Sequence, residues 1–263
     1  YLLGDESLVE RVTALECRRR SAFGNGTEVA AMNECAGRTV RIYDALTAQI
    51  AYLLAVYRHR PQTIAALERM IGAYVLERTS ELGSVGRGAC VKGARFVREV
   101  RIGDGATIDG ATLLENGTLC AGAFVGADVK ARDFILAEGA RVDNGSILER
   151  CFVGESSVLD KGFTATHSLF FANCHCECGE AASVFAGPYT VSHHKSTLLI
   201  AGMFSFFNAG SGSNQSNHLF KSGAVHQSVH LRGCKFGSGA YIMSPALEGA
   251  FTMVLGHHAH HHD

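Results

Sequence analysis

The chain has 263 residues, 47% of them hydrophobic and 19% charged, which is typical of a globular protein with a sizeable core. Its formal net charge is −1, with acidic and basic residues interleaved, so we expect neither a nucleic acid nor a membrane surface as a partner. No apolar run reaches the roughly 20 residues of a membrane-spanning helix. The start of the chain also lacks the pattern of a signal peptide, so we expect a cytoplasmic protein.

Cysteine usage agrees with that location. The nine cysteines are an odd number scattered through a chain that needs no covalent staples, which favours free thiols over a disulfide framework. The chain begins at Tyr1 rather than at a methionine, and we expect it to be part of a longer protein.

Residues 1–43 combine strand-like alternation with turn glycines, as in FGNGTEVAAMNECAGRTVRIYD. We expect them to form the initial coils of a β-structure.

Residues 44–82 interrupt this pattern and predict a helical hairpin. The first helix is expected in DALTAQIAYLLAVYRHR, with Asp44 as its N-cap and its end near Arg60. Pro61 then fits the first turn of a second helix. The apolar stripes of the two helices are Ile50, Leu53, Leu54 and Tyr57, and Ile64, Leu67, Ile71, Tyr74 and Val75. These stripes predict packing against a core rather than a cofactor site.

Residues 83–263 contain an aliphatic residue about every six positions, followed by glycine or a small polar residue, as in IGDGATIDGATLLENGTL. The clearest rows are Ile102, Ile108 and Leu114, and Ile147, Val153 and Leu159. Such spacing places one inward side chain on each short strand and a small residue at each corner. Stacked coils of this kind make a parallel β-helix with a continuous aliphatic core, so the fold class expected is mainly β with an inserted helical hairpin.

These repeats resemble the hexapeptide-repeat superfamily of left-handed β-helices, which includes sugar acyltransferases and domains of sugar nucleotidyltransferases. More closely, AYVLERTSELGSVG, SLFFANC, FAGPYTVSHHKSTLLIAGMFSFFNAGSGSNQSNH and GAFTMVLGHH resemble proteins of the domain of unknown function 4954 family. The broader resemblance implies a left-handed helix and a homo-oligomer, often a trimer. It also implies an activity on a sugar or nucleotide-linked sugar, with acyl-coenzyme A as a co-substrate.

The segment SHHKS carries the candidate catalytic residues, His193 and His194. In hexapeptide acyltransferases a histidine removes the proton of the acceptor hydroxyl or amine, and the pKa of histidine suits it to that role. On a strand only one of the two adjacent side chains can point into a given pocket. Lys195 is a candidate for binding a phosphate or carboxylate. The alternative is one buried, hydrogen-bonded histidine beside a solvated one.

The segment NAGSGSNQSNH is the second candidate part of the site. Its carboxamides at Asn208, Asn214, Gln215 and Asn217 can bind sugar hydroxyls or stabilise an oxyanion, and His218 and His226 extend the cluster. It lacks the Gly-Lys-Ser/Thr ending of a phosphate-binding Walker loop. The alternative is a polar surface loop, or asparagines stacked inside the corners of the helix.

Two other groups of residues favour structural roles. Cys174, Cys176 and Cys178 alternate, but they lack the usual zinc-knuckle spacing, so we expect interior thiols and no metal site. The aspartates at predicted turns are Asp104, Asp109, Asp128 and Asp133, and we expect them to accept hydrogen bonds from nearby backbone amides.

Three functions remain open from the sequence. The first is a transferase acting on a sugar-type substrate, with His193 or His194 as general base. The second is a non-catalytic domain that binds a small ligand, and the third is an oligomeric scaffold.

Overall fold

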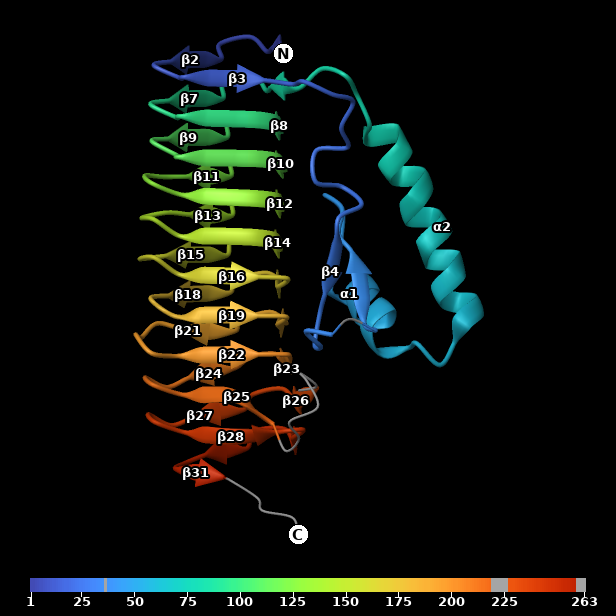
Figure 1. The fold of residues 1–263 in the computed structure, drawn as a ribbon, viewed down its shortest axis with the longest axis vertical. Helices are drawn as coiled ribbons and strands as arrows, with labels where there is room; N and C mark the ends of the chain where they lie inside the picture. The colour runs from blue at the N-terminus through green and yellow to red at the C-terminus, as the bar shows by residue number, and fades with distance from the viewer. Residues whose placement is uncertain (36, 219–226, 259–263) are drawn as a thin grey trace.

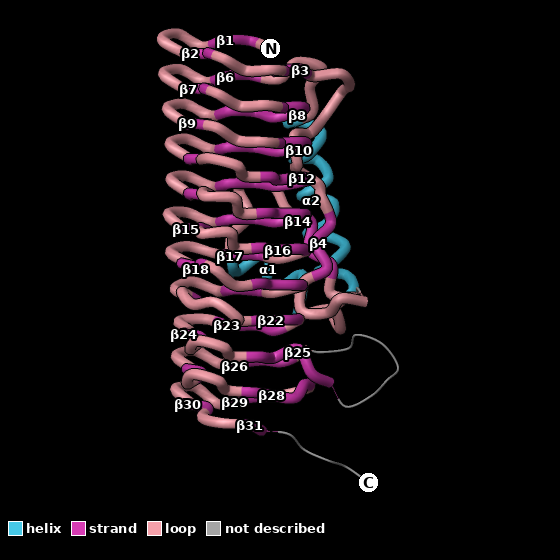
Figure 2. Tube along the Cα trace, turned by 60° about the vertical axis from the view of Figure 1, so that its left-hand side comes forward, coloured by secondary structure: helices cyan, strands magenta, loops and turns pink. Residues whose placement is uncertain are grey.

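The chain forms a parallel β-solenoid with one large insertion (Figure 1). The computed structural model describes residues 1–35, 37–218 and 227–258. The described chain is mainly β with two helices, and the two long sheets are parallel throughout, which confirms the predicted fold class. The two termini lie at opposite ends of the solenoid (Figure 2).

Each coil has three sides. The first side contains β3 (Ala14–Glu16), the first halves of β8 (Phe96–Ile102), β10 (Leu113–Leu119), β12 (Lys130–Leu136) and β14 (Ile147–Val153), then β16 (Thr164–Thr166), β19 (Glu180–Ala182), β22 (Leu198–Ile200), β25 (Asn214–His218), β28 (Tyr241–Ser244) and β31 (His257–His258). The second side contains β1 (Leu2–Leu3), β6 (Ser84–Val85), the second halves of β8 to β14, β17 (Leu169–Phe170), β20 (Phe185–Ala186), β23 (Gly202–Phe204), β26 (Ser228–His230) and β29 (Leu247–Glu248). The third side contains β2 (Leu8–Glu10), β7 (Cys90–Lys92), β9 (Thr107–Asp109), β11 (Phe124–Val125), β13 (Arg141–Val142), β15 (Val158–Asp160), β18 (His175–Glu177), β21 (Val191–Ser192), β24 (Asn208–Ala209), β27 (Lys235–Phe236) and β30 (Met253–Val254).

The repeat is one residue shorter than three hexapeptides. Lys130 pairs with Ile147, and Ile147 with Thr164, so one coil takes 17 residues. Inward positions are five residues apart around the corner between the first and second sides and six apart around the other two. The buried residues Leu148, Val153 and Leu159 show this spacing.

This difference corrects one predicted row of core residues. Ile102, Ile108 and Leu114 are all buried as expected, because their spacing crosses only six-residue corners. Ile147 was expected in the same role but is 44% exposed, and its neighbour Leu148 is buried instead. The row that starts at Ile147 crosses the five-residue corner, so a strict period of six places its first member outside.

The corners are made by residues with left-handed backbone angles. At the bend between the first and second sides, Asn116 and Asp133 have φ of 51° and 53°, and Asn116 Nδ2 donates to Asp133 Oδ1 at 2.6 Å. Asn and Asp tolerate this region better than other non-glycine residues. Asp104 Oδ1 accepts the Arg87 N–H at 2.9 Å, as predicted for a turn aspartate.

The insertion leaves the solenoid after β3 and returns at β6. It contains an antiparallel hairpin of β4 (Glu28–Ala30) and β5 (Thr39–Arg41), followed by α1 (Ala48–Val56) and α2 (Pro61–Arg78). The stretch expected as initial coils is therefore divided between β1 to β3 in the parallel sheets and β4 and β5 in this separate hairpin. Neither helix in the described ranges is long and apolar enough to cross a membrane.

The helix ends differ from the prediction. Thr47, not Asp44, caps α1, and its hydroxyl accepts the Ile50 N–H at 3.4 Å. Asp44 instead accepts a hydrogen bond from the Tyr74 hydroxyl, and it forms an ion pair with Arg78 at 3.6 Å. Pro61 begins α2 as predicted.

The insertion covers the second side of the solenoid and creates a second hydrophobic core there. The predicted stripe of α2 packs against this core, and Ile71 is fully buried in it. In α1, Leu54 is buried, but Tyr57 of the predicted stripe is 38% exposed. From the solenoid, Phe152, Leu169 and Phe185 project outward into this core.

Candidate functional site

A groove on the outer surface of the third side brings together several of the predicted site residues. One column of residues runs along this surface, each directly after the inward-facing residue of its rung: Asp160, Glu177, His193, Gly210, Gly237 and Leu255. Because the two glycines have no side chains, the column is empty between His193 and Leu255. A groove with a volume of about 380 Å³ lies along this gap.

The floor of the groove is backbone that cannot easily carry a side chain. A Cβ at Gly210 would lie 2.6 Å from the Phe236 carbonyl oxygen. The Gly210 N–H donates to that same oxygen at 2.8 Å, which fixes the distance between the two rungs. The close approach explains why glycine is required at this position.

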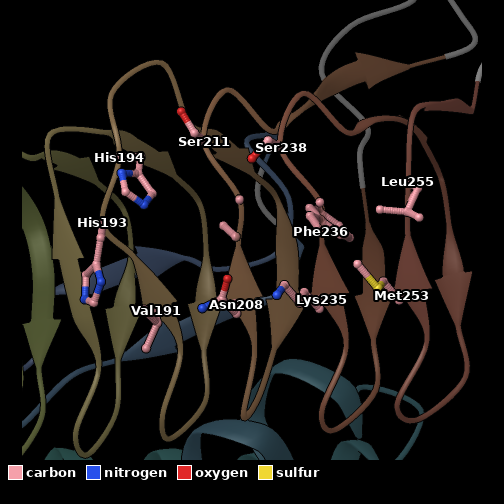
Figure 3. Close-up of a pocket in the computed structure, with 13 residues that line it drawn as sticks. Val191, His193, His194, Asn208, Ser211, Lys235, Phe236, Ser238, Met253 and Leu255 are labelled. Carbon is pink, nitrogen blue, oxygen red and sulfur yellow. The ribbon is translucent and has the colours of Figure 1, made fainter.

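One wall is formed by the neighbouring outward column of the same sheet (Figure 3). Val191, Asn208, Lys235 and Met253 are register partners on successive rungs β21, β24, β27 and β30. Four rungs at the usual strand spacing extend over about 14 Å, which is the length of a small molecule with several functional groups.

The other wall follows the next corner of the coils. His194 lies there with Ser211 and Ser238 (Figure 3). The lining therefore offers hydroxyl groups, one carboxamide, two imidazoles and the ammonium group of Lys235, and it contains no acidic residue.

His193 stands at one end of the groove and belongs to a polar cluster. Its ring makes an edge contact with the ring of His175, with 4.3 Å between the centroids. His175 Nε2 lies 3.0 Å from Glu177 Oε1, and Lys161 Nζ lies 2.6 Å from Glu177 Oε2. The hydrogen bond from Lys161 holds the pKa of the Glu177 carboxyl below its ordinary value, so Glu177 stays charged and holds His175 in place.

The protonation of His193 follows from its surroundings. Partial burial, together with the neighbouring His175, lowers the pKa of His193 below its ordinary value of 6.5. The imidazole is therefore neutral near pH 7 and can accept a proton.

The other predicted site residues are distributed over the molecule. His193, His194 and Asn208 line the groove, while Lys195 is exposed in the turn that follows His194. Asn214 and Gln215 lie on β25, on the first side. The backbones of Asn217 and His218 also belong to β25, but their side chains, and His226 altogether, lie outside the described residues.

Gln215 points into the solenoid rather than toward a ligand site. It is fully buried, and its Nε2 lies 2.7 Å from Nε2 of the buried His230. His230 stacks on Phe204, with 4.8 Å between the centroids, and its Nδ1 forms an ion pair with Glu248. This buried polar group replaces aliphatic residues in the inward columns of the last coils.

Lys235, Ser211 and Ser238 line the groove but were not singled out from the sequence. Lys235 comes 27 residues after its register partner Asn208, because the intervening coil contains extra residues. The signal that could have identified the groove is the pair of glycines that directly follow β24 and β27. Recognising it requires the 17-residue register.

The three alternating cysteines are mainly structural. Cys174 and Cys176 are buried in the solenoid core, as predicted, and burial raises the pKa of the Cys174 thiol to about 12. Cys178 lies at a corner with φ of 58° and is partly exposed. All nine cysteines are free.

Comparison with known proteins places the chain in a family. It is 25% identical over 235 residues to a protein of Treponema pallidum (strain Nichols) described as an uncharacterized protein, a match that covers 83% of this chain. The matched part spans about a third of that relative, 32% of its length. The chain matches the domain of unknown function 4954 over residues 1–263, and it therefore belongs to that family.

Proposed function

We propose that the groove on the third side binds a hydroxyl-bearing anionic small molecule, such as a phosphorylated sugar, and that His193 removes a hydroxyl proton during group transfer. The donor of the transferred group is an acyl thioester or a nucleotide-linked sugar, as the likeness to hexapeptide-repeat transferases suggests. The observation that carries the proposal is a neutral His193 at the end of a groove that is otherwise lined with hydrogen-bonding groups and one cation.

The lining supports the chemical class of ligand. Lys235 projects from the middle of the outward column, and among the described residues no carboxylate lies within ion-pair distance of it. A phosphate or carboxylate of the ligand is its natural counter-ion. Asn208, Ser211 and Ser238 offer the short polar side chains that bind sugar hydroxyls.

The position of His193 supports a role in proton transfer. Its ring contacts His175, which Glu177 anchors, so the imidazole is held at the end of the groove. A neutral imidazole in a fixed position contributes typically about 10²–10⁴-fold to the rate of a reaction that needs a general base.

The first experiment is a thermal-shift screen of the purified protein against sugar phosphates, nucleotide sugars and acyl-coenzyme A species. A ligand that binds only the native state raises the melting temperature. We expect Lys235→Gln to abolish the shift. We expect His193→Ala to retain binding but to reduce turnover by roughly 10²-fold or more. His59→Ala is the matched control, because His59 is an exposed histidine on the insertion.

The pH profile gives a further test. A base with a lowered pKa stays active through neutral pH, so turnover should fall only as the pH drops below about 6.5. A His193→Ala variant as active as the parent would remove the catalytic role. The absence of any shift across the panel would remove the ligand site as well.

The open shape of the groove favours a second candidate function, non-catalytic binding of the same class of ligand. This function predicts a thermal shift that depends on Lys235 and no turnover with any donor. The homo-oligomer expected from the resemblance stays a prediction, and the mass of the purified protein in solution tests it.

A further inference from the structure

A ladder of apolar side chains runs along the outer surface of the second side. Its members are register partners on successive rungs: Ile135, Phe152, Leu169, Phe185, Met203, Val229 and Leu247. The insertion buries the first four completely, Met203 and Val229 are half-buried, and Leu247 is 76% exposed. The coils from β25 onward extend beyond the insertion (Figure 1).

A groove opens where the ladder emerges from beneath α1. Its volume is about 530 Å³, within the usual size of small-molecule sites. The α1 wall is formed by Ala48, Gln49, Tyr52 and Leu53, and the opposite wall includes Phe185, Met203 and Leu231. Sites for small molecules occur preferentially between two structural units, and this groove lies between the insertion and the solenoid.

Arg232 supplies the only side-chain ion pair donor in the lining that has no carboxylate partner among the described residues. Its guanidinium lies over the ring of Phe206, 4.1 Å from the centroid, which holds the cation at the rim of the groove. No aspartate or glutamate lines the groove. The charge of the rim therefore complements an anionic group on a ligand whose remainder is apolar.

Phe206 occupies a backbone position that disfavours it. At this corner each coil donates an N–H to the preceding coil, and the donors include Gly122, Gly139, Tyr189 and Phe206. Glycine accepts the left-handed conformation without strain, whereas Phe206 adopts it at φ of 47° while 40% exposed. Its ring packs against Tyr189 and Arg232, so the strained residue positions the cation.

We propose that this groove is a second ligand site, which binds an amphipathic carboxylate: the apolar body lies between α1 and the ladder, and the carboxylate pairs with Arg232. Guanidinium and carboxylate are matched in geometry for two parallel hydrogen bonds. This site is separate from the groove of the third side and does not depend on the function proposed for it.

Decanoate is a suitable probe, and 1-decanol has the same apolar chain without the charge. Isothermal titration of the unmodified protein, below the concentration at which decanoate forms micelles, measures binding without any substitution. We expect saturable binding of decanoate that is weakened roughly tenfold in Arg232→Gln, because a hydrogen-bonded ion pair is lost. Binding of 1-decanol should be the same in both proteins.

Arg95→Gln is the matched control, since Arg95 also lies over a phenylalanine ring, that of Phe96, but outside the groove. It should bind decanoate as the unmodified protein does. Because the chain has no tryptophan, Tyr52→Trp also places a single fluorescent reporter on the α1 wall, and its emission should change with decanoate. Absence of saturable binding, or equal affinity in Arg232→Gln, would overturn the proposal.

Discussion

Gly117 and Phe134 show how single residues maintain the spacing of the coils. They are register partners on β10 and β12, and the Phe134 ring lies over Gly117 inside the solenoid. A Cβ on Gly117 would be 2.2 Å from Phe134 Cε1, so the glycine provides the space that the ring fills. The buried aromatic ring and the missing side chain therefore depend on each other.

Gly117→Ala should consequently destabilise the protein by about 1–3 kcal/mol, because the ring must leave its position in a close-packed core. Gly72→Ala is the control. Gly72 is in the interior of α2, where a Cβ would meet only the Arg41 side chain at 3.8 Å, so this change should stabilise the protein by about 0.5–1 kcal/mol. Denaturant unfolding of both variants measures the two signs, and equal stability of Gly117→Ala and the parent would contradict the packing argument.

At the scale of elements, a histidine connects the β4–β5 hairpin to the solenoid. His167 lies at the bend between β16 and β17, and its Nδ1 accepts the Ala30 N–H of β4 at 3.1 Å. Partial burial, and secondarily Arg150, lowers the pKa of His167 below its ordinary value of 6.5. Protonation of Nδ1 would remove the acceptor, so attachment of the hairpin is linked to a neutral ring.

The sign of the pH dependence follows. Well above pH 6.5 both folded and unfolded states are neutral at this residue, and it contributes no pH dependence. As the pH falls below 6.5, the unfolded state binds the proton first, so the free energy of unfolding decreases until the pH passes the lowered folded pKa. His193 contributes in the same direction.

His167→Gln should therefore reduce the loss of melting temperature between pH 7 and pH 5, since glutamine keeps an acceptor but does not titrate. His59→Gln serves as the control and should leave the pH dependence unchanged. An undiminished loss in His167→Gln would show that this histidine does not link the hairpin to the solution pH.

At the scale of the whole molecule, two hydrophobic cores share one sheet. One core runs inside the solenoid, and the other lies between the second side and the insertion. Phe152 and Val153 are consecutive residues of β14 that point into different cores, because successive side chains on a strand alternate. The β14 strand is therefore apolar on both of its surfaces over this stretch.

Phe152→Ala should cost about 3–5 kcal/mol in the second core and should loosen the insertion first. Hydrogen exchange should accelerate in α1 and α2 more than in the strands of the third side. Leu159→Ala, inside the solenoid, provides the contrast, because faster exchange is then expected in β13, β15 and β18, which surround it. Uniform acceleration throughout the chain in both variants would mean that the two cores unfold as one unit.

The sequence by itself determined the parallel coils, the helical hairpin and the buried residues of the rows whose spacing is truly six. Those features depend on local periodicity, which a strand or a helix expresses without reference to distant parts of the chain. It also identified His193, His194 and Asn208 as candidate site residues, because polar residues between apolar strands are visible in the linear order.

Tertiary structure alone decided which of those polar residues share a surface. One five-residue corner in each coil shifts the register, which moved Ile147 outward and placed Gln215 inside beside His230. Lys235 joined Asn208 only through the pairing of β24 with β27, across a coil with extra residues. A groove arises from residues that are neighbours between coils, and their sequence separation depends on the length of each coil, so periodicity along the chain cannot specify it.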